Sequence, residues 1–371
     1  MKINSFEVTG LLGRSKTLSL SLNSDINIIT GRNGSGKTSL LKLLWYVLSG
    51  NIGLALREVE FRKATLETTA YTCTIYKITD SRCRIDWKDE NGNQIFEDAA
   101  DDDGDVIFHA EEDANALLIN CGSSVFLPTF RRIEGGFTIG ERGFGLNALS
   151  RMKDDIEDSL VGLSRRLSHK KHVFVSALST IDIVSLLVRK YADLSEEYNR
   201  IQENTSKGVI SQIKVFESKS DADETNAEAL QLLNTIRHEI EGMEKKREEI
   251  MTPMEQLKQT VTRLFRHSGI KFGQKLNFGD AATAVSSELL SAGEKQMLSF
   301  IAYNAFYRDS VIIIDEPELS LHVDWQRQLF PILQKQHATN QFIIATHSPF
   351  IYSKYPDKEV QIDANRGDEE C

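Results

Sequence analysis

Residues 31–38, which read Gly-Arg-Asn-Gly-Ser-Gly-Lys-Thr, constrain the fold of this chain more than any other stretch. They fit the pattern G-x-x-x-x-G-K-[ST], in which glycines let backbone N–H groups surround phosphate oxygens at a helix N-terminus. The apolar residues 26–30 predict a short buried strand before the loop, and residues 39–45 predict the helix after it. In such a loop, Lys37 would neutralise the β- and γ-phosphates and Thr38 would bind Mg²⁺. The residues expected to contact the nucleotide are Asn33, Gly34, Ser35, Gly36, Lys37, Thr38 and Ser39.

The composition argues against several classes of protein. A chain of 371 residues suffices for one large domain or two to three smaller ones. Its apolar runs stay below the roughly 18 residues of a membrane helix, so we expect no membrane span. The four cysteines lack C-x-x-C spacing, which favours a reducing cytoplasm over a zinc site or a disulfide framework. The net charge of −10 disfavours nucleic acid as a general partner, and the basic residues 165–172 form either a local binding surface or a solvated helix end.

The first 145 residues are predicted to form a nucleotide-binding lobe with a β subdomain. Residues 2–8 and 17–22 alternate between apolar and polar side chains, as antiparallel strands do, and residues 60–120 look β-rich. The acidic stretch 97–105 favours an exposed loop over a metal site, because it matches no calcium-loop spacing. Residues 124–132 predict a buried strand that runs into Arg131, which either senses phosphate charge or belongs to a surface pair.

Residues 146–268 are predicted to form a helical insertion, with a short core strand near 172–178. Apolar residues recur at helical spacing from about Thr180 to Gln202 and again from Ala229 onwards, on either side of a polar stretch at 203–226. This pattern predicts an antiparallel helical hairpin with a polar tip and too few heptads for a long coiled-coil arm. Pro253 is expected to kink or split the second helix. Residues 269–371 then form the C-terminal lobe.

Two apolar runs in the C-terminal lobe end in chemically active side chains. Residues 311–314 predict a fully buried parallel strand that ends in Asp315 and Glu316. Asp315 would support the Mg²⁺ shell, and Glu316 would polarise an attacking water. Residues 341–345 predict a second buried strand that leads into Thr346-His347-Ser348. Because such strands bind ligands at their carboxyl ends, we expect these side chains to lie near Lys37.

The ordered motifs resemble those of ABC-type ATPases of the SMC/RecF/OLD branch. Residues 290–294 (Leu-Ser-Ala-Gly-Glu) resemble the family's signature, and residues 318–322 (Glu-Leu-Ser-Leu-His) stand where its D-loop contacts the opposite subunit. Residues 126–135 and 316–322 also look similar to ATPase subunits of bacterial anti-phage systems of the Septu, retron-associated and PARIS types. No clear Q-loop glutamine is present, and residues 128–132 take its place provisionally.

The resemblance implies an α/β fold: an ABC ATPase head with a mostly parallel core sheet, an N-terminal antiparallel β lobe and an inserted helical hairpin. It implies ATP and Mg²⁺ as ligands, with Thr38 and Asp315 holding the metal. Glu316 would be the catalytic base, and His347 would bond the γ-phosphate and report hydrolysis. Ser291 and Gly293 would cap the ATP of the other subunit, so the resemblance implies a homodimer with two composite sites and leaves larger assemblies open.

The resemblance also narrows the function to a soluble dimeric switch in the cytoplasm. Nucleases of the OLD kind carry a Toprim domain after the ATPase, but only 24 residues follow His347 in this chain of 371. We therefore expect an ATP-hydrolysing sensor of an anti-phage system that controls a nuclease or toxin on a separate chain. The alternative is a RecF/SMC-like repair ATPase that binds DNA. A transporter ATPase subunit fits worst, because the long insertion is atypical there.

Overall fold

The computed structural model describes residues 1–100, 106–129, 159–176, 180–219, 225–264, 291–336 and 339–363. Its contacts divide the chain into two compact units. The first, here called the ATPase unit after the proteins that its motifs resemble, comprises residues 1–178 and 292–371, and the second, the helical unit, comprises residues 179–291. Among the described residues, no helix has both the length and the apolar character that crossing a membrane requires.

The N-terminal part of the ATPase unit forms a six-stranded sheet in the order β2-β1-β4-β5-β6-β7. Every neighbouring pair is antiparallel, and β5 and β6 bury every second side chain, which confirms the predicted antiparallel lobe. The strands are β1 (Ile3–Thr9), β2 (Thr17–Ser21), β4 (Lys63–Thr68), β5 (Tyr71–Lys77), β6 (Cys83–Asp89) and β7 (Gly92–Glu97).

A second six-stranded sheet, in the order β11-β10-β12-β13-β3-β14, combines strands from distant parts of the chain. All five of its neighbouring pairs are parallel, which confirms the predicted core sheet. Its four interior strands, β10, β12, β13 and β3, are buried at every residue, as expected for runs without polar alternation. The strands are β3 (Ile26–Thr30), β10 (Ser124–Leu127), β11 (His172–Phe174), β12 (Val311–Asp315), β13 (Gln341–Ala345) and β14 (Glu359–Gln361).

Helix α1 (Lys37–Ser49) joins the two sheets, because it packs against β4 on one side and against β10, β12 and β13 on the other. Its Trp45 is fully buried, and the ring centroids of Phe126 and Phe174 lie 5.7 and 5.3 Å from that of Trp45. This aromatic cluster ties β10 and β11 to the helix that follows the phosphate loop. It therefore fixes the loop relative to the core sheet.

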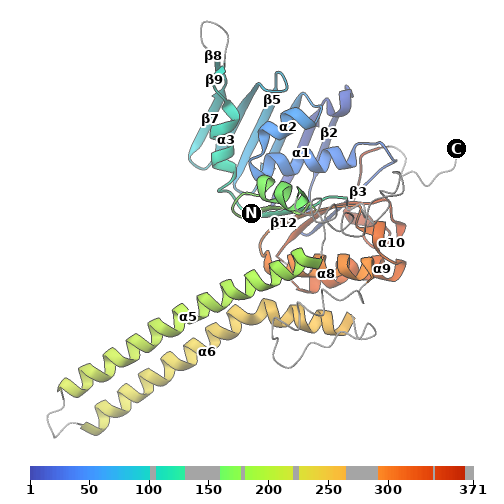
Figure 1. The fold of residues 1–371 in the computed structure, drawn as a ribbon. Coiled ribbons are helices and arrows are strands. Elements are labelled where there is room, and N and C mark those ends of the chain that lie inside the picture. The colour runs from blue at the N-terminus through green and yellow to red at the C-terminus, as the bar shows by residue number, and fades with distance from the viewer. Residues whose placement is uncertain are drawn as a thin grey trace, which may run out of the picture. The chain divides into compact units, whose positions relative to one another are not determined.

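The remaining short elements of the ATPase unit cover the sheets or connect their strands (Figure 1). The helices are α2 (Ile52–Glu58), α3 (Ala110–Leu118), α8 (Ala292–Phe306), α9 (Val323–Gln336) and α10 (Pro349–Tyr352). The single-turn 3-10 helices are η1 (Leu11–Gly13), η2 (Pro317–Ser320) and η3 (Pro356–Lys358). A two-stranded sheet, β8 (Ala99–Ala100) with β9 (Val106–Phe108), projects beyond the antiparallel sheet in Figure 1.

The helical unit is an antiparallel hairpin of α5 (Thr180–Lys219) and α6 (Thr225–Leu264), each of 40 residues (Figure 1). The prediction of a polar loop over 203–226 is wrong for most of its length, because helix continues to Lys219 and resumes at Thr225. Exposed polar residues are compatible with a helix, and here the i,i+4 pair of Glu203 and Lys207 supports it. At 1.5 Å per residue each helix is about 60 Å long, so the expectation of too few heptads for an arm is also wrong.

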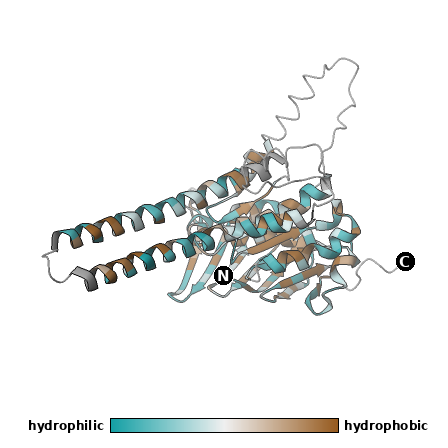
Figure 2. Cartoon of the chain, turned by 90° about the horizontal axis from the view of Figure 1, so that it is seen from below, coloured by the Kyte–Doolittle hydropathy of each residue, from teal (hydrophilic) through white to brown (hydrophobic). Residues whose placement is uncertain are grey.

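Pro253 lies inside α6 without splitting it, and Figure 1 shows α6 changing direction along its C-terminal part. Apolar residues recur among polar ones along both helices (Figure 2). The contacts place residues 159–176 in the ATPase unit rather than in the helical insertion expected from residue 146, because β11 pairs with β10 and Asn51 donates to the carbonyl of Leu167 at 3.1 Å.

Candidate nucleotide site

The phosphate loop connects β3 to α1 and depends on two glycines in left-handed backbone conformations. Gly34 has φ 77° and Gly36 has φ 97°, values that residues with a Cβ adopt at a cost. A Cβ on Gly36 would also lie 3.0 Å from Leu12 Cδ1. The loop therefore requires glycine at these positions for backbone reasons, as the motif predicts.

Lys37, the first residue of α1, turns its ammonium group back over the loop. Lys37 Nζ donates to the carbonyl oxygens of Gly31 at 3.0 Å and Arg32 at 3.3 Å, and it lies 2.5 Å from Nε2 of His347. Burial lowers the pKa of Lys37, while the carboxylates of Glu316, Asp315 and Glu318 oppose that shift. The structure thus brings the predicted phosphate-binding lysine and the predicted switch histidine together from positions 310 residues apart.

Asp315, at the carboxyl end of β12, accepts hydrogen bonds from two threonines. Thr38 Oγ1 donates to Asp315 Oδ2 at 2.9 Å, and Thr129 Oγ1 donates to the same oxygen at 2.5 Å. Asp315 is 1 % exposed, and among the described residues nothing bonds its buried Oδ1. A buried carboxylate oxygen without a donor, beside a threonine hydroxyl, fits the hard oxygen ligands that Mg²⁺ prefers.

Thr129 is a site residue that the sequence interpretation did not single out. It lies two residues past β10, which pairs with β12 in parallel register, Leu127 opposite Ile314. Parallel strands end at the same edge of a sheet, so a polar residue just after β10 could have been expected to lie near Asp315. Arg131, assigned to this stretch from the sequence, lies outside the described residues.

Glu316 leaves the strand through an unusual backbone conformation. It adopts φ 48° and ψ 59°, in the left-handed region that side chains other than glycine rarely occupy. Its N–H donates to the carbonyl of Ala345 at 2.9 Å, and its Oε1 lies 3.4 Å from Nε2 of His347. The turn therefore directs the proposed base toward the end of β13. Strained backbone of this kind is frequent at functional sites.

Glu318 has a role that the sequence analysis did not predict. That analysis assigned residues 318–322 to a loop that contacts another subunit. Its Oε1 accepts the backbone N–H of His347 at 2.6 Å, and burial raises the pKa of its carboxyl group. The neighbouring Ser348 is held as well, since its hydroxyl donates to Gln326 Oε1 at 2.6 Å. These bonds fix the segment that carries His347. The sequence feature that could have pointed to this role is Glu-Pro-Glu, in which Glu318 follows Glu316 by two residues.

The signature stretch contacts the turn after β12 within this chain. A Cβ on Gly293 would lie 2.6 Å from the carbonyl oxygen of Ser320, so α8 packs against η2 too closely for any side chain. Gln296 reinforces this contact by donating to the carbonyl of Pro317 at 3.3 Å. Ser291, just before α8, is exposed. No second copy of the chain is present, so the role of Ser291 and Gly293 toward another subunit stays a prediction.

Arg14, from the connection between β1 and β2, also reaches the phosphate loop. Its guanidinium donates to the carbonyl oxygens of Ser35 at 3.0 Å and Gly34 at 3.2 Å. The sequence analysis singled out no residue of this connection, and no local pattern distinguishes this arginine from other arginines of the chain. It adds positive charge beside the predicted phosphate site.

Comparison with known proteins assigns the chain to a family. Residues 26–353 match the family described as "AAA domain, putative AbiEii toxin, Type IV TA system". The Escherichia coli protein "Retron Ec83 probable ATPase" is 37% identical over 73 residues, which is 16% of this chain and 14% of that protein. This chain therefore spans only about one seventh of the length of that curated relative.

Similar solved structures have low sequence identity to the chain. An Smc head domain with a coiled coil and joint from Pyrococcus yayanosii is 13% identical, with a TM-score of 0.41 over 99% of this chain and 96% of that one. The recombination mediator RecF is 13% identical, with a TM-score of 0.32 over 94% and 93%. Because the family match covers most of the chain, including all the motifs described above, the chain belongs to this AAA-domain family.

Proposed function

We propose that this protein hydrolyses ATP with Mg²⁺ as a dimeric cytoplasmic switch, and that the switch controls a separate nuclease or toxin in anti-phage defence. The observation that carries the catalytic part is the meeting of Lys37, Asp315, Glu316 and His347 at the carboxyl ends of β3, β12 and β13. These residues come from both ends of the chain. Their convergence supplies a cation, a metal ligand, a base and a hydrogen-bonding imidazole at one point.

Each side chain has a defined task in the proposed reaction. Lys37, already held by two loop carbonyls, neutralises charge on the phosphates, and the glycine-rich loop presents its N–H groups to them. Thr38 and Asp315 would hold Mg²⁺, which when bound neutralises charge on the β- and γ-phosphate oxygens. Glu316 orients and polarises the attacking water. His347 bonds the γ-phosphate, and its 3.4 Å approach to Glu316 allows it to respond when that phosphate leaves.

The dimer part of the proposal rests on Ser291 and Gly293. In the proposed dimer, these residues at the start of α8 contact the ATP held by the other subunit, so each site contains parts of both chains. The exposure of Ser291 and the positive end of the α8 dipole support this assignment. ATP binding would then close the dimer, and hydrolysis would open it.

Control of a defence effector is supported by the family, whose description includes a putative AbiEii toxin, and by the relative described as a probable retron ATPase. The test is affinity purification of Glu316→Gln, with ATP and Mg²⁺, from cells that express the native gene cluster, followed by native mass spectrometry. A complex of two copies with a second protein that carries nuclease or toxin motifs is the expected result. A homodimer that carries DNA and no second protein would overturn effector control in favour of a repair clamp.

A further inference from the structure

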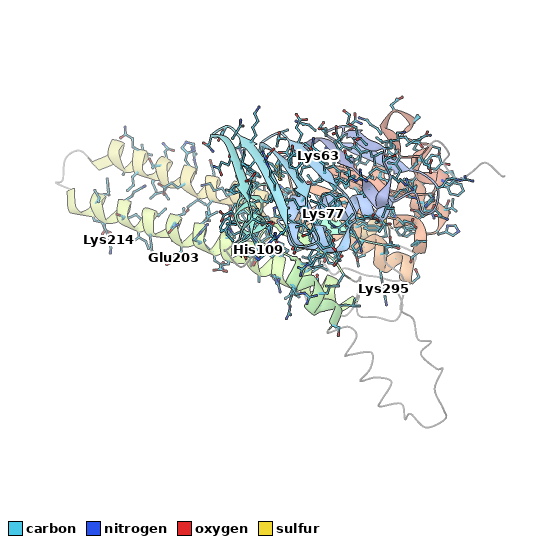
Figure 3. The ribbon with its side chains drawn as sticks, turned by 90° about the horizontal axis from the view of Figure 1, so that it is seen from above. Lys63, Lys77, His109, Glu203, Lys214 and Lys295 are labelled. Atoms are coloured by element: carbon cyan, nitrogen blue, oxygen red, sulfur yellow. The ribbon has the colours of Figure 1, made fainter. Side chains whose placement is uncertain are left out.

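Three metal-binding side chains converge at the base of the β8–β9 hairpin, in the antiparallel lobe. Asp98 follows β7, His109 precedes α3, and Glu111 lies in the first turn of α3. One ligand atom from each of the three lies within 4.8 Å of the others. Figure 3 labels His109 beside the antiparallel sheet. None of the three takes part in the nucleotide site described above.

Two of these side chains carry buried atoms that lack a hydrogen-bond partner. His109 Nδ1 and Glu111 Oε2 are both inaccessible to solvent, and among the described residues neither atom is bonded. The three side chains form no hydrogen bond or ion pair with one another. In the described part of the chain, no lysine or arginine forms an ion pair with Asp98 or Glu111 either. Leaving such polar atoms buried and unpaired costs free energy, so this arrangement suits a ligand that accepts lone pairs from all three.

Asp98 is held in place by the backbone around it. Its Oδ1 accepts the N–H of Ala110 at 2.8 Å, and its Oδ2 accepts the N–H of Cys83 at 2.8 Å. The carboxylate is therefore oriented between β6 and the first residue of α3. A carboxylate with two backbone hydrogen bonds keeps lone pairs for a metal, and such bonds are the usual way in which a ligand is preorganised.

We propose that Asp98, His109 and Glu111 bind one divalent transition-metal ion of the Zn²⁺ class. A metal at about 2.0–2.2 Å from each ligand requires donor atoms within about 4.2 Å of one another, which small side-chain rotations here achieve. The imidazole nitrogen selects transition ions over Mg²⁺ and Ca²⁺, which take oxygen ligands. The bound ion would connect the β8–β9 hairpin to α3, which packs on β6 and β7.

The test is isothermal titration of the full, untagged and chelator-treated chain with ZnCl₂ in the absence of nucleotide. We expect about one Zn²⁺ per chain, with affinity at least about tenfold lower in His109→Ala and in Glu111→Gln. The matched controls Glu112→Gln, next to Glu111, and His238→Ala, an exposed histidine of α6, should bind as the wild type does. Wild-type affinity in both His109→Ala and Glu111→Gln, or no Zn²⁺ binding by the wild type, would overturn the proposal.

Two further measurements separate this site from the nucleotide site and from misfolding. Asp315→Asn should retain Zn²⁺ binding, and loss of binding in that variant would assign the ion to the nucleotide site instead. With Co²⁺ as the probe, the visible absorption bands of the wild type should disappear in His109→Ala while its far-ultraviolet circular dichroism stays unchanged. Unchanged Co²⁺ bands in His109→Ala would contradict the assignment of the imidazole as a ligand.

Discussion

The candidate nucleotide site and the helical hairpin use charged side chains in opposite ways. In the nucleotide site, Lys37 and Asp315 are 5 % and 1 % exposed, and each contacts groups from other strands or loops. In the hairpin, the pair of Glu203 and Lys207 is mostly exposed and links only successive turns of one helix. A substitution in the candidate site removes contacts to several partners in a buried environment of low dielectric. A substitution in the hairpin affects a side chain that water already solvates. Substitutions should therefore have large effects on activity or stability at the carboxyl ends of the core strands and small effects in the hairpin.

The largest effect is expected for Glu316→Gln. It removes the proposed base but keeps the size of the side chain, so ATP hydrolysis should fall by about 10²- to 10⁴-fold while ATP still binds. Phosphate release at saturating ATP, with binding followed by titration, is the measurement. Glu90→Gln, in the exposed turn between β6 and β7, is the matched control and should hydrolyse ATP normally. Normal turnover by Glu316→Gln would show that another group is the base.

Lys37→Ala should reduce ATP affinity by about 10- to 100-fold, because it removes a charge-assisted contact to phosphate. Fluorescent-nucleotide titration measures the effect. The control is Lys16→Ala, an exposed lysine before β2, which should bind ATP as the wild type does. Equal affinities for the two variants would contradict the phosphate-loop assignment and remove the contrast between buried and exposed charges.

Gly293→Ala should destabilise the ATPase unit by about 1–3 kcal/mol, because its Cβ would collide with the carbonyl oxygen of Ser320, 2.6 Å away. Urea unfolding followed by tryptophan fluorescence measures the change. This result would separate a packing role of Gly293 from a role toward a second subunit. Unchanged stability would show that α8 and η2 adjust without cost.

Glu318 allows a test of buried charge by pH. Burial raises the pKa of Glu318 in the folded protein above its usual value of about 4.5, so the folded state holds the proton more tightly than the unfolded state. Its contribution to stability is therefore fully present below the unfolded pKa and is lost as pH rises through the folded pKa. Relative to Glu318→Gln, which cannot ionise, the wild type should lose stability as pH rises from about 4.5 toward 7.

Urea unfolding of the wild type and of Glu318→Gln at several pH values measures this difference. A stability difference between the two that stays constant over the range would show that Glu318 titrates as an exposed carboxyl group does. Glu90→Gln serves as the exposed reference, and its stability difference from the wild type should vary little with pH.

The smallest effect, with the opposite sign, is expected in the hairpin. Gly242 lies inside α6, and apart from the nearby backbone of its own helix a Cβ there would have no heavy atom of the described residues within 4 Å. Gly242→Ala should therefore stabilise the helical unit by about 0.5–1 kcal/mol through helix propensity alone. Thermal unfolding followed by circular dichroism measures it. A destabilised variant would indicate that this face of α6 contacts another group in solution. The side chains of the hairpin would then not be the solvent-exposed ones that the comparison assumes.

Much of the site could be predicted from the sequence because its residues lie in short motifs with local physical causes. Backbone sterics require the glycines of the phosphate loop, and apolar runs that end in polar residues indicate buried parallel strands with ligand groups at their ends. The two sheets, and the placement of Lys37, Asp315 and His347 at one edge, follow from those patterns. Family resemblance added the expected roles, which the experiments above test.

Contacts between distant residues were decided only by the tertiary structure. Thr129 meets Asp315 across 186 residues, and Glu318 meets the backbone of His347 across 29, and the local sequence around these residues does not show which group each one contacts. The same holds for Arg14 on the phosphate loop and for the convergence of Asp98, His109 and Glu111. The length of α5 escaped prediction for a related reason, since an exposed polar helix and a polar loop share a composition. Periodicity shows which face of an element is buried, but the packing of strands and helices decides which side chains meet there.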